Sequence, residues 1–256
     1  MGILDGFKKK KDNQQFNVQW EYYMSHCDNP HVVRFDTSLN NLTDDMRKRY
    51  PHTIELRVPF SEDGDQVMRI KKIEDNFSVG SYDIRYIGVL TYGDCKVFSF
   101  CCEANAENDF NGIVQTLMAS NEGVDYSFEV LTNDNLRYYD DILAPSLYER
   151  HWIENNHLCN HLESKGEGFS KPRTIDFFLC FASPQHIQDV ADKLCEQGFN
   201  ELSREKSEDG EYLLELTLED IPSFDRMNEI TIGILDLLDG TDGYFDGWGC
   251  PVEKKE

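Results

Sequence analysis

The chain has 256 residues, 48 of them acidic and 25 basic, which gives a formal net charge of −23 at pH 7. This balance works against direct binding of nucleic acid, because attraction to a phosphate polymer comes from Lys and Arg, and it favours a protein partner with a basic surface. No apolar stretch approaches the roughly 20 residues of a membrane span and no signal peptide is recognisable, so we expect a cytoplasmic protein that does not contact a membrane.

Length and composition predict two domains, because 39% of the residues are hydrophobic and can supply a core to each. We place a flexible tail at residues 1–15, a first domain at residues 16–146 and a second at residues 147–256. The eight cysteines show no C-x-x-C spacing and no framework of a small secreted domain. We therefore expect reduced thiols, as in a cytosolic protein.

The first domain begins with a predicted β-hairpin over residues 16–35, where apolar and polar residues alternate on both sides of Asp28-Asn29-Pro30. The elements predicted after it are a strand at 53–59, a helix from 67 to 77, strands at 83–91 and 96–102, a helix at 108–119 and a strand at 126–130. The order βαββαβ is that of a ferredoxin-like fold, one antiparallel sheet with two helices on one face. The hairpin is expected to extend the edge of this sheet.

The second domain repeats the pattern after a helix predicted over 147–163. The further elements are a strand at 174–181, a helix at 184–197, strands at 199–206 and 211–218, a helix at 223–238 and a strand at 244–248. Ser183 is the predicted N-cap of the first of these two later helices. The expected fold class is therefore α+β, with two ferredoxin-like βαββαβ domains, the first extended by an N-terminal β-hairpin.

The helix over 147–163 carries a group of histidines with metal-ligand spacing. His157 and His161 stand four positions apart on one helix face, and His151 lies about two turns before His157. A zinc or nickel site would require further ligands, and the sequence offers no matching distant pair. We therefore predict a solvated histidine face with no metal and no other cofactor, and a metal-dependent enzyme using His157 and His161 is the alternative.

The stretch from Leu238 to Pro251 combines glycines, acids and aromatic residues. Glycine at alternating positions indicates unusual backbone angles or close approach of another group. Two interpretations stay open: the aromatic residues are displayed together with neighbouring acids, or Tyr244 and Trp248 seal a small core. From Lys171 to Glu256 the chain has 20 acidic and 8 basic side chains, so that charge and aromatic surface adjoin here.

The second domain has three segments that carry a family resemblance, namely residues 174–176, the Glu208-Asp209-Gly210 turn and residues 244–249. On these residues the domain resembles the bacterial regulator of ribonuclease E activity B family. That family has an acidic ferredoxin-like domain that ends in a Tyr-Asp-Gly-Trp-Gly motif. Here Phe245 is inserted after the tyrosine or takes its place, and the family's long acidic tail does not follow Val252. The first domain is similar to an uncharacterised bacterial domain often fused to this regulator, on the residues Trp20, Tyr23, Ile73-Glu74-Asp75, Tyr86-Ile87-Gly88 and Leu143-Ala144-Pro145.

The resemblance implies a non-enzymatic protein that inhibits an endoribonuclease, or another basic nucleic-acid-processing partner, by binding it. The residues expected to contact this partner are Asp239, Asp242, Tyr244, Phe245, Asp246 and Trp248. A structural protein that self-associates is the second hypothesis, in which the Gly-Trp-Gly segment is only core. Catalysis by paired acids such as Asp140-Asp141 is the third and least favoured hypothesis. The sequence shows no nucleophile, phosphate-binding loop or metal shell beside such a pair.

Overall fold

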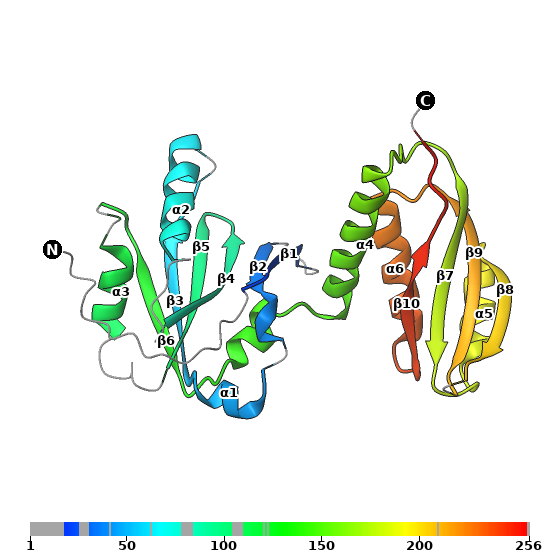
Figure 1. Cartoon of the computed structure of the whole chain (residues 1–256), viewed down its shortest axis with the longest axis horizontal. Helices are drawn as coiled ribbons and strands as arrows, with labels where there is room; N and C mark the ends of the chain where they lie inside the picture. The colour runs from blue at the N-terminus through cyan, green and yellow to red at the C-terminus, as the bar shows by residue number, and fades with distance from the viewer. Residues whose placement is uncertain are drawn as a thin grey trace. The chain divides into compact units, whose positions relative to one another are not determined.

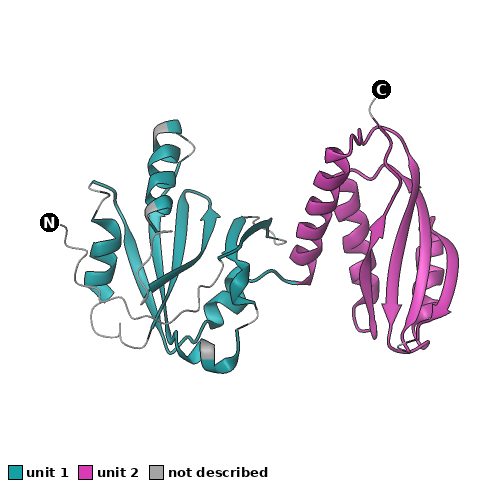
Figure 2. Cartoon of the chain, in the orientation of Figure 1, with its two compact units in different colours: residues 1–146 teal, residues 147–256 magenta. Residues whose placement is uncertain are grey.

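In this computed structural model the chain divides into two compact units, residues 1–146 (unit 1) and residues 147–256 (unit 2), coloured separately in Figure 2. The structure describes residues 18–25, 31–40, 42–61, 63–77, 84–103, 110–119, 121, 123–208 and 210–254, and the tail predicted at 1–15 lies outside them. Within these ranges the cysteines are free, and no helix combines the length and apolar character that a membrane crossing requires.

Unit 1 is built on a six-stranded antiparallel sheet with the strand order β1-β2-β4-β5-β3-β6 (Figure 1). Its strands are β1 (Trp20–Met24), β2 (Val32–Asp36), β3 (His52–Pro59), β4 (Ile84–Tyr92), β5 (Cys95–Cys102) and β6 (Ser127–Thr132). Its helices are α1 (Asp44–Lys48), α2 (Gly64–Phe77) and α3 (Phe110–Met118), with a 3-10 turn (Thr37–Leu39) and a π-helical turn (Tyr139–Leu143).

The last four strands in the order of this sheet, β4-β5-β3-β6, together with α2 and α3, are the βαββαβ unit of a ferredoxin-like fold. The hairpin β1-β2 extends it as predicted, because β2 pairs antiparallel with β4. Apolar side chains of α2 and α3, such as Ile73 and Val114, pack on the sheet residues Ile54 and Phe98. On the other face, Leu136 and Leu143 near the π-helical turn are fully buried.

Unit 2 is a four-stranded antiparallel sheet with the order β10-β7-β9-β8, the same ferredoxin-like topology. Its elements are α4 (Leu147–Ser164), β7 (Arg173–Phe181), α5 (Ile187–Glu196), β8 (Asn200–Lys206), β9 (Tyr212–Asp220), α6 (Phe224–Leu238) and β10 (Gly243–Gly249). Side chains from α4, α5 and α6 share one core with alternate residues of β7 and β9 and with Phe245 and Trp248 of β10. The predicted α+β class with two ferredoxin-like units is confirmed.

The structure differs from the sequence-based expectations at two places. The helix expected from residue 184 begins at Ile187, and its N-cap is His186 without a side-chain hydrogen bond. Ser183 lies instead in the preceding turn, where its hydroxyl accepts a hydrogen bond from the backbone N–H of Gln185, 3.4 Å away. The second difference is α1, which was not predicted because five residues are too few to show a helical period.

Candidate partner-docking surface

The strand β10 contains an irregularity that decides which of its side chains are exposed. Phe245 pairs with Leu179 of β7, but Gly247 pairs with Phe178 and Trp248 with Phe177, so that the register shifts between Phe245 and Gly247. Asp246 is therefore the extra residue of a β-bulge. Gly247 has a φ of 142°, a backbone conformation that side chains rarely adopt, which explains the glycine at this position.

The bulge turns Phe245 and Trp248 toward the same side of the sheet, into the core. They are 4% and 8% exposed, respectively, and belong to the cluster that α4, α5 and α6 share with the sheet. The prediction that Phe245 and Trp248 are displayed for a partner was therefore wrong. Strict alternation would have placed them on opposite faces, and the inserted Asp246 removes that alternation.

Polar groups of α4 complete the environment of these two rings. The indole Nε1 of Trp248 donates a hydrogen bond to Oδ1 of Asn155 at 2.7 Å, and the Phe245 ring lies 5.4 Å from the ring of His151. Asn155 itself is buried and donates through Nδ2 to Thr231 of α6. The aromatic pair therefore joins β10 to the two helices.

The other four predicted contact residues, Asp239, Asp242, Tyr244 and Asp246, are exposed. Asp239 is the C-cap of α6. The carboxyl group of Asp242 has a hydrogen bond with Ser183, and this contact, together with backbone hydrogen bonds, lowers the pKa of Asp242. Tyr244 lies on β10, where a hydrogen bond with Cys180 raises the pKa of its hydroxyl. Asp239 and Asp242 thus lie at the end of the sheet where α6 leads into β10, and Tyr244 and Asp246 lie along the strand itself.

The face of the unit 2 sheet opposite the helices, here called the open face, joins acidic residues of all four strands on one surface. Its positions alternate with the core residues and pair with one another across the strands. They are Thr174, Asp176, Phe178 and Cys180 of β7; Asn200, Ser203 and Glu205 of β8; Leu213, Glu215, Thr217 and Glu219 of β9; and Tyr244, Gly247 and Gly249 of β10, with Leu202 and Asp246 at the two bulges.

The open face is acidic over its whole breadth. Asp176, Glu205, Glu215, Glu219 and Asp246 supply five carboxylates, and none of the positions that define this face is Lys or Arg. Burial, and then the charges of nearby Asp246 and Glu211, raise the pKa of the Cys180 thiol near its centre. Such a surface has a strongly negative potential and matches a positively charged one.

Sequence reasoning missed the part of this surface that lies on β7 and β9. The missed residues, Asp176, Phe178, Glu215 and Glu219, are members of strands whose core residues alternate regularly. That alternation was a usable signal, because residues two apart along a strand share a face. The acids of β10 continue across the neighbouring strands of the same face.

The histidines of α4 do not form one group. His157 and His161 are exposed, whereas His151 is buried, with its Nδ1 2.9 Å from the carboxylate of Glu154. In the part of the chain that the structure describes, no three His, Cys, Asp or Glu side chains are arranged to hold a metal ion. His151 therefore belongs to the packing around Phe245 and does not join the other two.

A buried ion pair that was not predicted fixes the C-terminal residues to unit 2. Glu167 is fully buried and accepts hydrogen bonds from the guanidinium of Arg173 and from the backbone N–H of Glu253, 2.8 Å away. The pairing with Arg173 lowers the pKa of Glu167 to about 2. Arg173 also donates to the carbonyl oxygen of Pro251, so that the chain just after β10 is held in place.

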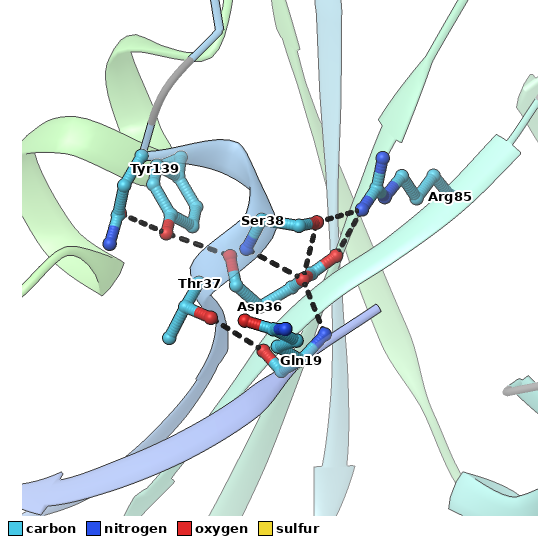
Figure 3. A network of polar contacts seen from close by, with 7 residues as sticks. Gln19, Asp36, Thr37, Ser38, Arg85 and Tyr139 are labelled. Atoms are coloured by element: carbon cyan, nitrogen blue, oxygen red, sulfur yellow. Dashed lines mark hydrogen bonds and ion pairs between the residues drawn. The ribbon is translucent and has the colours of Figure 1, made fainter. Parts of the chain in front are cut away.

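Unit 1 contains a polar network around the fully buried Asp36 (Figure 3). Asp36 pairs with Arg85 and accepts from the hydroxyl of Ser38, while its carbonyl oxygen accepts from the hydroxyl of Tyr139 at 2.8 Å. Gln19 joins through its backbone N–H. These contacts connect β2 with β4 and with the π-helical turn, and they satisfy the buried carboxylate as a structural network does.

The acids considered for catalysis have partners of their own. Asp140 pairs with Arg47 at the border of a shallow surface depression. Asp242 is held by Ser183 at one end of β10 and Asp246 lies at the bulge. The open face, to which all four strands of unit 2 contribute carboxylates, is therefore the candidate site.

Comparison with known proteins finds a family model that matches most of unit 2. Residues 152–250 match the model of a family described as Regulator of ribonuclease activity B. No curated protein matches the chain. Among solved structures, one described as a "putative glycine cleavage system transcriptional repressor" is 7% identical, with 77% of this chain and 96% of that chain covered at a TM-score of 0.24. The aspartate kinase of Clostridium acetobutylicum is 10% identical, with 74% of this chain and 33% of that chain covered at a TM-score of 0.24. Neither of these two structural similarities bears on function.

Proposed function

We propose that unit 2, which carries the match to a family of ribonuclease regulators, is a protein-docking module that inhibits an endoribonuclease by covering its basic surface. The observation that carries the proposal is the open face, with its five carboxylates and neither Lys nor Arg. An enzyme that accepts RNA presents Lys and Arg to phosphate groups. An acidic protein face can occupy the same side chains and thereby compete with RNA.

The proposal assigns different tasks to the residues of β10. Tyr244 and Asp246 contact the partner, together with the acids of β7 and β9, and Asp239 and Asp242 extend the negative field at the end of the sheet. Phe245 and Trp248 hold the strand in position from the core side. Binding needs no cofactor and no catalytic step, and the chain itself binds no nucleic acid and no membrane. The expected location is the cytoplasm, where such a nuclease works.

Electrostatic docking has a dependence on salt that a test can use. Complementary charge raises association rates by about 10- to 1,000-fold at low ionic strength, and salt screens the effect over about 8–10 Å at physiological concentrations. A self-associating interface built on apolar area would survive the same salt. The direction of the salt effect therefore separates the proposed function from the self-association hypothesis.

The test is inhibition of purified ribonuclease E by the full-length protein, measured as cleavage of a fluorescent RNA at about 50 mM and about 300 mM salt. Inhibition is expected at the lower concentration and much less at the higher. The variant Asp176→Asn/Glu215→Gln/Asp246→Asn should inhibit at least about tenfold less well, because three negative charges are removed from the open face.

The matched control changes the same number of charges away from the open face. The triple variant Asp189→Asn/Glu196→Gln/Asp225→Asn alters exposed acids of α5 and α6 and should inhibit as the unchanged protein does. Equal loss in both variants would show that net charge alone acts. Absence of both binding and inhibition at low salt would reject ribonuclease E as the partner and the proposal as stated.

A further inference from the structure

Gly249 of β10 is a glycine that the fold itself does not require. Unlike Gly247 it has no left-handed backbone conformation, and a Cβ atom built on it would meet nothing within 4 Å. A glycine inside a strand weakens the strand, and one without a conformational reason often marks a place that another group approaches closely. The space above Gly249 opens on the open face, since Gly249 pairs with Asp176.

The same space continues over Gly247, where a Cβ would also meet nothing within 4 Å. Gly247 pairs with Phe178, whose ring is partly exposed and is therefore left uncovered on the β10 side. On the β9 side Phe178 pairs with Glu215. Asp176 lies two positions before Phe178 on the same face of β7, and Glu215 lies opposite Phe178 on β9, where its Oε2 accepts a hydrogen bond from Ser203 of β8. On the β10 side, Phe178 and Asp176 face two residues without side chains, Gly247 and Gly249.

We propose that Asp176, Phe178, Glu215, Gly247 and Gly249 form a seat for an arginine side chain of the protein partner. This guanidinium seat rests on the docking function proposed above and specifies the chemistry that it recognises. A planar guanidinium can stack on the Phe178 ring while its N–H groups reach the carboxylates on either side. The ammonium of lysine is compact and strongly hydrated, so that it gains less from a ring and a carboxylate placed in this way.

Unit 1 shows the same combination of groups within the chain. The guanidinium carbon of Arg34 lies 4.5 Å from the centre of the Trp20 ring, and Nη1 of Arg34 pairs with the carboxylate of Glu74. Ring and carboxylate there hold one arginine side chain between them. On the open face the ring and the carboxylates are present, and the guanidinium is what the partner would contribute.

The test measures binding of fluorescent nona-arginine and nona-lysine peptides to the full-length protein at low salt. The unchanged protein should bind both, nona-arginine more tightly. Gly249→Val places a side chain in the seat and should weaken nona-arginine binding about tenfold, to the level of nona-lysine, with no loss of thermal stability. Phe178→Leu, which removes the ring but keeps the position apolar, should have the same effect on nona-arginine and little on nona-lysine.

The control is Gly233→Ala, compared with Gly249→Ala. A Cβ at Gly233 of α6 also meets nothing within 4 Å, but it lies on the helical side of the unit. Gly233→Ala should leave both peptides unaffected, whereas Gly249→Ala should reduce the preference for arginine. If the seat variants fold and keep the full preference, the guanidinium seat is refuted while acidic docking stands. If neither peptide binds the unchanged protein, the docking function itself is refuted.

Discussion

Trp248 and Asn155 are joined by a hydrogen bond of 2.7 Å from the indole Nε1 to the amide oxygen, in the buried interior of unit 2. The amide nitrogen of Asn155 donates to Asn228 and Thr231, both on α6. One asparagine of α4 therefore holds β10 on one side and α6 on the other. Trp248 is therefore an anchor of the fold, and the docking surface proposed above is the opposite face of the strand that it holds.

Asn155→Ala should lower the free energy of unfolding of unit 2 by about 1–3 kcal/mol, because it leaves the buried indole N–H without an acceptor. Chemical denaturation followed by circular dichroism measures the change. Asn160→Ala, at an exposed position of the same helix, is the control and should change stability by less than about 0.5 kcal/mol. Equal losses in the two variants would contradict the structural role of the Asn155–Trp248 pair.

Trp248→Ala should destabilise unit 2 by about 3–5 kcal/mol, as truncation of a large buried aromatic residue does. Tyr244→Ala should cost much less, because nearly half of the Tyr244 side chain is exposed. The same denaturation experiment compares the two variants. A Trp248→Ala protein with unchanged stability and weakened partner binding would contradict the anchoring role and support a Trp248 that contacts the partner directly.

The sequence was sufficient for the strands of both units and for their helices other than α1, because period-two and three-to-four spacing are strong where a residue such as Phe177 or Ile187 faces a core. The sequence was insufficient to predict which side chains of β10 are buried, because Phe245 and Trp248 are three positions apart and yet face the same side. A bulge depends on the pairing of Gly247 with Phe178 of another strand, which no local pattern encodes. The acidity of unit 2 was evident from composition, but the presence of five carboxylates without Lys or Arg on the open face follows from the register between strands.

Gly88 of β4 illustrates a second feature that only the structure reveals. A Cβ at this position would lie 2.8 Å from the carbonyl oxygen of Arg34 and 2.9 Å from Cδ1 of Leu143. Gly88→Ala should therefore destabilise unit 1 by about 1–3 kcal/mol through overpacking. Gly64→Ala is the control, since a Cβ at Gly64 in the first turn of α2 meets nothing within 4 Å. Thermal unfolding should show a loss for the first variant and none for the second.

The buried pair of Glu167 and Arg173 should make unit 2 sensitive to acid. Pairing with Arg173 lowers the pKa of Glu167 from an ordinary 4.5 to about 2 in the folded protein. A carboxyl group whose pKa is lowered on folding stabilises the protein above its unfolded pKa and loses that contribution as pH falls through its folded pKa. The stabilisation is therefore complete above about pH 5, declines through the interval from pH 4.5 to 2, and amounts to about 3 kcal/mol.

Glu167→Gln should accordingly lower the free energy of unfolding at pH 7 by about 3–5 kcal/mol, because it leaves the buried guanidinium without its counter-charge. The difference from the unchanged protein should shrink as pH falls from 4.5 toward 2, which urea unfolding at several pH values would measure. Glu196→Gln, at an exposed position of α5, should give the same stability as the unchanged protein at each pH. A Glu167→Gln deficit that stays constant down to pH 2 would mean that the lost stability comes from packing and not from the charge of Glu167.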